Sequence, residues 1–316
     1  MSFLKSLFGV SDNSDAASAR QQESDRNFDI LKYDGIRALR QGDGDYAVKC
    51  LTHALQIKDD GECREHLANA YLQQGDPVAA LGQMNVLAES EPDNSALLLR
   101  KAEVAYLADA YDVVADTCMT ILELAPDNSR ACLLYGRAFM AQGNDIQAIA
   151  MLTKAISIDE DCLDAYLLRG GLLMKLGDLD GAGADASLLV GKVPDSEDAQ
   201  LLSARVTAAR GQHQEAIEIY NKVIELNPFC VEAFRERGAI RLALGDKDGA
   251  EADMRQVLEL SPHELDATSG DFTAEGREGI QCKVEQNYRN MNPYGFSQDK
   301  SKRMEQKMSK MFVRLE

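Results

Sequence analysis

A spacing of 34 residues recurs through most of this 316-residue chain and limits what the chain can fold into. Glycine or aspartate recurs at this interval, a small apolar residue follows five positions later, and five of the seven prolines share a third phase. The three series are Gly42, Gly75, Asp109, Gly143, Gly177, Gly211 and Gly245; Ala47, Ala80, Val114, Ala148, Ala182, Ala216 and Ala250; and Pro92, Pro126, Pro194, Pro228 and Pro262. A period in this range is typical of a solenoid, in which each unit packs only on its neighbours.

The residue types in each unit predict two helices joined by a tight turn. Glycine can take a positive φ after the first helix. Pro77 is placed just inside a second helix, where its missing N–H costs nothing, and the phased prolines end the second helices. Small residues on the first helices allow close approach of the second: Ala68, Ala102, Gly136, Gly170, Ala204 and Gly238. The sequence therefore predicts an all-α protein.

The pattern resembles the tetratricopeptide repeat (TPR) family over seven units, about residues 28–263. The resemblance rests on a small residue at repeat position 8, an aromatic at 11 (Tyr71, Phe139), Gly at 15, Ala at 20 and Pro at 32. The departures from the family pattern are Asp109, Val114, Arg237 and Arg241. The resemblance implies a right-handed superhelical solenoid of helix-turn-helix repeats, closed by a C-terminal capping helix.

We expect four parts along the chain. Residues 1–26 are a short apolar segment and a flexible linker, and residues 27–263 are the seven-repeat solenoid. Residues 264–292 are the capping helix, and residues 293–316 are a basic amphipathic tail. A length of 316 residues would suggest two domains, but the unbroken repeat predicts one continuous array.

The N-terminal segment has an apolar face of Phe3, Leu4, Leu7 and Phe8. It either docks on the first repeat or frays, or it anchors the chain to a partner or a membrane. Because Lys5 is the only cation there for anionic lipid, membrane docking is disfavoured.

The last 18 residues differ in charge from the rest of the chain. Residues 299–316 carry six Lys or Arg and three Asp or Glu, a net +3, within a chain of −18. Their apolar residues fall on one helical face: Met304, Met308, Met311, Phe312 and Leu315. A basic, Met-lined helix is typical of a partner-binding element. The tail is either solvated or lies in an acidic, apolar groove of its own or a neighbouring chain.

Composition excludes several functions. An acidic pI near 4.7 argues against nucleic-acid binding, which needs clustered Lys and Arg. The sequence contains no run of 18 apolar residues, so it predicts no membrane-spanning helix. The N-terminus lacks the features of a signal peptide. The seven cysteines contain no Cys-x-x-Cys pair, which favours reduced thiols in the cytoplasm. The four His residues show no metal-ligand spacing, so we expect no metal, no cofactor and no enzymatic activity.

The resemblance implies that the first helices of the repeats line a concave groove. Leucine doublets at repeat positions 5 and 6 indicate an apolar groove with isolated arginines, suited to an amphipathic helix or an extended peptide of another protein. The candidate groove residues are Leu99, Arg100, Tyr106, Arg130, Leu133, Leu134, Arg137, Met140, Leu167, Leu168, Met174, Leu201, Leu202 and Arg205.

Acidic residues at repeat position 2 disfavour one type of TPR ligand. Adaptors of this family that clamp a C-terminal carboxylate place cations at positions 2, 6 and 9, whereas here position 2 is mostly acidic: Asp29, Glu62, Asp164, Asp198 and Glu232. We therefore expect a non-enzymatic protein-interaction scaffold. The alternative is a self-associating or autoinhibited regulatory subunit whose basic tail occupies the groove. In the self-associating form the protein would be a homo-oligomer held together through the tail.

Overall fold

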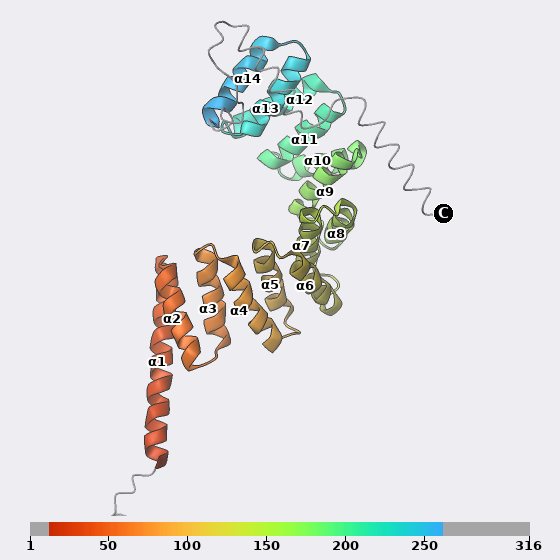
Figure 1. Cartoon of the computed structure of the whole chain (residues 1–316). Coiled ribbons are helices and arrows are strands. Elements are labelled where there is room, and N and C mark those ends of the chain that lie inside the picture. The colour runs from red at the N-terminus through yellow and green to blue at the C-terminus, as the bar shows by residue number, and fades with distance from the viewer. Residues whose placement is uncertain (1–12, 262–316) are drawn as a thin grey trace, which may run out of the picture. The chain divides into compact units, whose positions relative to one another are not determined.

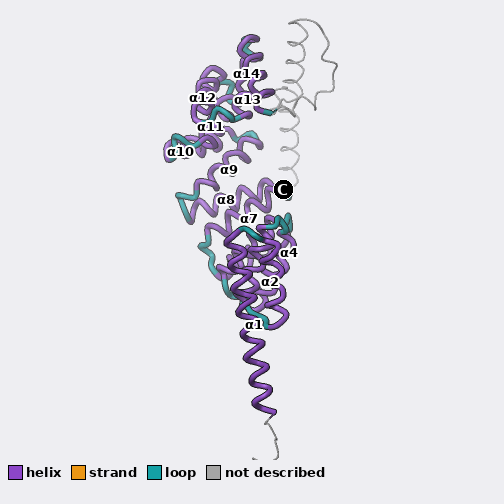
Figure 2. The backbone as a smooth tube through the Cα atoms, turned by 90° about the vertical axis from the view of Figure 1, so that its left-hand side faces the viewer, coloured by secondary structure: helices purple, strands orange, loops and turns teal. Residues whose placement is uncertain are grey.

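The computed structural model describes residues 13–261, with side chains from residue 17 onward. This part of the chain is built from fourteen helices joined by short loops, and it contains no strand (Figure 2). The predicted all-α fold is confirmed. The apolar segment 1–9, the predicted capping helix 264–292 and the tail 293–316 lie outside the described residues.

The helices belong to two compact units, Met1–Ala165 and Tyr166–Glu316, within each of which consecutive helices pack side by side (Figure 1). The first unit holds α1 (Asn13–Gln41), α2 (Gly44–Ile57), α3 (Gly61–Gln73), α4 (Pro77–Ser90), α5 (Ser95–Leu107), α6 (Tyr111–Leu124), α7 (Ser129–Ala141) and α8 (Asp145–Ile158). The second holds most of α9 (Leu163–Leu176), then α10 (Leu179–Lys192), α11 (Glu197–Ala209), α12 (His213–Leu226), α13 (Val231–Ala243) and α14 (Lys247–Leu260). Odd-numbered helices are the first helices of the repeats, and even-numbered helices are the second helices.

The turn between the two helices of a repeat has the predicted backbone. All six glycines of the series have φ between 75° and 90°. Asp109, which replaces the glycine in the third repeat, has φ 54° and is the only non-glycine residue with positive φ in the described part of the chain. The glycines are therefore needed for the turn, and aspartate tolerates the same conformation.

The aspartate after several of these glycines caps the second helix. Asp76 accepts a hydrogen bond from the backbone N–H of Ala79, and Asp246 accepts one from Gly249. Each bond satisfies an amide that has no partner inside the helix. Pro77 lies in the first turn of α4, as predicted. The Gly-Asp pairs thus end one helix and begin the next.

Small residues bring the helices of a repeat together. A Cβ atom at Gly136 of α7 would lie 2.9 Å from Cγ of Leu152 of α8, and one at Gly170 of α9 would lie 3.3 Å from Cβ of Asp185 of α10. The Cβ atom at Gly170 would also lie 2.8 Å from Cδ2 of Leu202, on the first helix of the next repeat. The small apolar residues at position 20 are fully buried in all seven repeats. The predicted close packing is confirmed, and it leaves no room for larger side chains at these positions.

The first helix is longer than the sequence predicts. It begins at Asn13, within the stretch through residue 26 that we expected to be a flexible linker. Alanines are strong helix formers and are frequent in this stretch, and Gln21 donates a hydrogen bond to Asp25 one turn later. Helix formation is cooperative, so the packed part of α1 extends through these residues.

Candidate protein-binding site

The candidate groove residues lie on first helices in both units. In the first unit, α5 carries Leu99, Arg100 and Tyr106, and α7 carries Arg130, Leu133, Leu134, Arg137 and Met140. In the second unit, α9 carries Leu167, Leu168 and Met174, and α11 carries Leu201, Leu202 and Arg205. We call these two sets the first-helix surface of each unit.

The leucine doublets divide between the core and this surface. Leu134 (7% exposed), Leu201 (8%) and Leu202 (4%) are buried. Leu134 packs with Cys118 and Ala138 in the core of the first unit. The apolar side chains of the first-helix surface that remain half-buried are Leu99, Tyr106, Leu133, Met140, Leu167, Leu168 and Met174. These seven residues, rather than whole doublets, can contact a partner.

The arginines of the first unit bind acidic residues on the neighbouring first helix. Arg137 forms an ion pair with Asp164 at 2.7 Å, and Arg130 forms a longer one with Glu103 at 3.4 Å. Arg100 pairs with Glu65 of α3 and donates a hydrogen bond to Asn69, also of α3. Each arginine therefore links two successive repeats.

Arg205 does the same in the second unit. Its guanidinium donates to both carboxylate oxygens of Glu236, at 2.8–3.0 Å. Glu236 is buried and also accepts a hydrogen bond from the hydroxyl of Tyr220 at 2.8 Å. A two-pronged contact of this kind fixes the arginine in place.

The acidic partners of these arginines were missing from the predicted site. Glu65, Glu103, Asp164 and Glu236 lie 27–35 residues from their arginines, close to one repeat along the chain. That separation was the available signal, since residues one repeat apart on first helices face one another. A carboxylate from a partner would have to displace these acids to reach the arginines.

A lysine forms a similar link at the start of the array. The amine of Lys32 on α1 lies 2.9 Å from Asp60 and 2.6 Å from Glu62. Burial alone would lower the pKa of Lys32, but the hydrogen bonds to these two carboxylates raise that pKa above its ordinary value. The lysine is therefore charged at every physiological pH, and it ties α1 to the second repeat.

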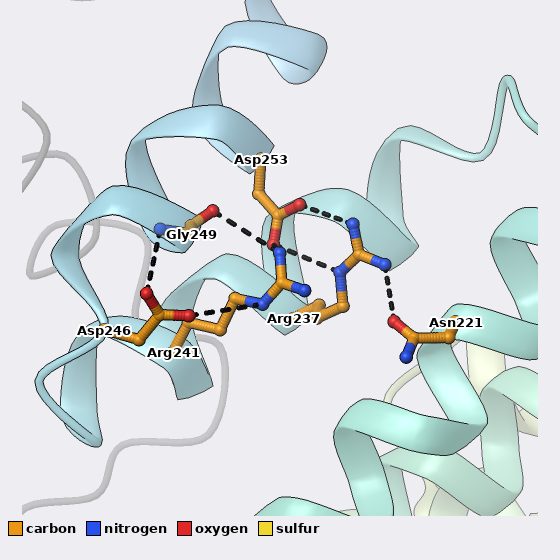
Figure 3. Close-up of polar contacts among 6 residues, drawn as sticks. All are labelled: Asn221, Arg237, Arg241, Asp246, Gly249 and Asp253. Atoms are coloured by element: carbon orange, nitrogen blue, oxygen red, sulfur yellow. Dashed lines mark hydrogen bonds and ion pairs between the residues drawn. The ribbon is translucent and has the colours of Figure 1, made fainter.

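A buried ion-pair cluster explains two departures from the family pattern in the second unit (Figure 3). Asp253 of α14, 2% exposed, accepts hydrogen bonds from Arg237 at 2.5 and 3.1 Å and from Arg241 at 2.9 Å. Arg237 also donates to Asn221 of α12 at 2.6 Å. Arg237 and Arg241 occupy positions that are apolar in the family pattern. The shared carboxylate of Asp253 and the carboxylate of Asp246, 3.8 Å from Arg241, compensate their charges. An equivalent pair 68 residues earlier joins Arg169 to Asp185.

Three of the buried thiols are poor nucleophiles. Burial raises the pKa of Cys63 to about 11, and that of Cys118 and Cys230 to about 12. A thiol reacts as its thiolate, so these groups are unreactive near neutral pH. Between residues 17 and 261 no group of three or more His, Cys, Asp or Glu side chains could hold a metal ion.

The family profile described as "Tetratricopeptide repeat" matches residues 65–129, 133–197 and 198–264. Among curated proteins, the chain is 30% identical over 123 residues to "Protein CTR9 homolog" of Arabidopsis thaliana, covering 39% of this chain and 11% of that protein. It is 27% identical over 256 residues to "Tetratricopeptide repeat protein 16" of Macaca fascicularis, covering 72% of this chain and 28% of that protein. The chain thus spans between a tenth and a third of the length of these relatives.

Solved structures share the fold. A tetratricopeptide repeat protein from Parabacteroides merdae superposes with a TM-score of 0.61 at 17% identity, covering 82% of this chain and 98% of that one. YrrB, described as a TPR protein with an unusual peptide-binding site, gives a TM-score of 0.50 at 15% identity, covering 64% of this chain and 97% of that one. None of the helices between residues 13 and 261 has the length and hydrophobicity needed to span a bilayer. The chain belongs to the tetratricopeptide repeat family.

Proposed function

We propose that this protein is a non-enzymatic scaffold whose first-helix surface binds a peptide or an amphipathic helix of another protein. The observation that carries the proposal is the recurrence of half-buried apolar side chains at the same repeat positions on successive first helices. Leu99, Leu133 and Leu167 share one repeat position, and Tyr106, Met140 and Met174 share another. Proteins of this family are generally interaction scaffolds, and YrrB is described as having a peptide-binding site.

The contacts around the surface define how such a ligand would bind. Affinity would come from burying the half-exposed leucines, methionines and Tyr106. The arginines are held rigidly by their acidic partners, so they present fixed N–H groups without ordering cost. Exposed Asp198 and Glu232 in the second unit favour a ligand with basic flanks over an acidic one.

The test is capture of partners from the native cell by the tagged full chain. A triple variant with Leu133→Ser, Leu168→Ser and Met174→Ser removes half-buried side chains while leaving buried Leu134 and Leu202 intact. We expect capture to fall at least about tenfold, since a combined loss of about 1.4 kcal/mol over the three apolar contacts is enough for that change. Met119→Ser, which truncates an exposed methionine of the second helix α6, is the control and should capture normally.

Unchanged capture by a triple variant with native circular dichroism would overturn the assignment of this surface.

We also propose that the protein works in the cytoplasm. In support, the six cysteines within the described residues are all free and none is fully exposed.

The alternative function is self-association or autoinhibition by the basic segment 299–316, lying on the first-helix surface. It is supported by the +3 charge of that segment against the acidic remainder of the chain. Deletion of residues 299–316 should then lower the mass measured by light scattering or raise partner capture. No change in either measurement would contradict the alternative.

A further inference from the structure

Two ion pairs show how successive first helices of the first unit align. Arg130 lies 3.4 Å from Glu103, and Arg137 lies 2.7 Å from Asp164. Each pair spans 27 residues and joins repeat position 9 of one helix to repeat position 2 of the next. Position 2 of a first helix therefore lies beside position 9 of the preceding first helix, and the two positions carry opposite charges in both pairs.

The corresponding pair is incomplete in the second unit. Asp198 of α11 is exposed, and the residue 27 positions before it is Gly171 of α9, which has no side chain. A Cβ atom at Gly171 would meet nothing within 4 Å, so the space beside this glycine is open. Asp198 forms no ion pair within the described part of the chain. Its carboxylate therefore lacks the cation that Arg137 supplies to Asp164.

The two helices are in contact at this point, because a Cβ atom at the neighbouring Gly170 would lie 2.8 Å from Cδ2 of Leu202 of α11. The remaining charged residues of α9 and α11 already have partners. They are Asp164, Arg169, Lys175, Glu197 and Arg205. Glu232 of α13 is also exposed, but it stands opposite Arg205 in the same 27-residue register. Asp195, in the loop before α11, adds a further exposed acid to the surroundings of Asp198.

Apolar side chains border the open space. Leu167, Leu168 and Met174 are three or four residues from Gly171 on α9, which places them around it on the helix surface, and all three are half-buried. A side chain lying over Gly171 would therefore cover apolar atoms along its length and reach a carboxylate at its end. Arginine has this composition, because an apolar stem carries a guanidinium that binds carboxylates.

We propose that the ligand of the first-helix surface places an arginine over Gly171, with its guanidinium on the carboxylate of Asp198. The ligand is an arginine-containing peptide of another protein. It repeats, between two proteins, the contact that Arg137 and Asp164 make within the chain. The inference rests on the proposed scaffold function, and it names the residue that fixes the position of the ligand on the second unit.

The test begins with a random peptide library selected on the full chain. We expect the selected peptides to share one arginine among apolar residues. In fluorescence anisotropy, changing that arginine to glutamate should lower the affinity at least about tenfold, and so should Asp198→Arg in the protein. Combining the two changes should restore the affinity to within about threefold, because the attraction returns with its signs exchanged. Asp248→Arg, at the second residue of α14 and also exposed, is the control and should change the affinity less than about twofold.

A second pair of variants tests the open space itself. Gly171→Arg supplies the missing cation within the chain, so it should lower the affinity for the arginine peptides at least about tenfold. Gly191→Arg changes a helical glycine of α10 that also has open space beside it. It adds the same charge away from Asp198, so it should leave the affinity within about twofold of the original.

The outcomes separate this inference from the function on which it rests. Peptides that lose binding to the triple variant of the first-helix surface, but bind normally to natively helical Asp198→Arg or Gly171→Arg, would overturn the inference and keep the proposed function. Peptides whose binding the triple variant leaves unchanged, or a selection without any binder, would contradict both. A rise in peptide affinity on deletion of residues 299–316, abolished by Asp198→Arg, would assign the site to the chain's own tail and overturn the proposal.

Discussion

At the scale of single residues, the positive φ of the turn glycines could be predicted from the sequence, and Asp109 shows how another residue can take the same conformation. A residue that ends one helix and allows the next to begin needs positive φ, so a recurring glycine pointed directly to the turn. Asp109 takes the same conformation at φ 54°, and its carboxylate accepts a hydrogen bond from the hydroxyl of Tyr111 at 2.5 Å. That local bond could not be anticipated from the repeat pattern, because no other repeat has the same pair.

Two glycines surrounded by open space should respond oppositely to alanine. Gly143 has φ 76°, so Gly143→Ala should destabilise the protein by about 1 kcal/mol through backbone strain alone. Gly82 lies inside helix α4 with normal φ, so Gly82→Ala should stabilise it by about 0.5–1 kcal/mol. Urea unfolding followed by circular dichroism measures both. A stabilising Gly143→Ala would contradict the turn assignment.

The buried thiols predict a pH dependence of stability. Burial raises the pKa of Cys118 to about 12, whereas an unfolded thiol ionises near pH 8.5. Above pH 9 the unfolded chain therefore loses a proton that the folded chain keeps, and the free energy of unfolding falls as pH rises toward 12. The urea midpoint should drop between pH 8 and pH 10, and less so in Cys118→Ala. An equal drop in both proteins would mean that other groups dominate.

At the scale of helices, the sequence predicted which helices form and in what order, but it did not predict which side chains of neighbouring helices contact one another. Apolar spacing located the helices, yet it did not separate leucines of the core, such as Leu134 and Leu202, from half-buried ones such as Leu168. That distinction depends on which turn of a helix meets the preceding repeat. The acids that bind Arg137 and Arg205 were equally hidden, because an ion pair across repeats requires the relative register of two helices.

The cluster around Asp253 should be important for the last repeat. Asp253→Ala would leave Arg237 and Arg241 partly buried without their shared carboxylate, which costs about 3 kcal/mol or more. Asp248→Ala, on an exposed position of the same helix, should change stability by less than about 0.5 kcal/mol. Hydrogen exchange should show that the loss of amide protection in Asp253→Ala is concentrated in α13 and α14, since the stability of a repeat depends mainly on its neighbours. A uniform loss of amide protection in all repeats would contradict the prediction that the cluster stabilises the last repeat alone.

At the scale of the whole molecule, the 34-residue repeat identifies the family, and the net negative charge favours a partner with basic residues over an acidic one. Seven repeats of two helices account for the fourteen helices of the described chain. Most of the net charge of −18 belongs to the repeats, because residues 299–316 contribute +3. Partner identity cannot be read from such a pattern, since the fold supplies a surface and the ligand is selected by a few side chains on it.

Hydrogen exchange of the full chain, alone and in complex with a partner captured from its native cell, tests the central claim most directly. If the first-helix surface binds the partner, amides of α5, α7, α9 or α11 should exchange more slowly in the complex. The second helices α6, α8, α10 and α12 should change little. Protection confined to second helices, or no protection of the first helices in a saturated complex, would contradict the account.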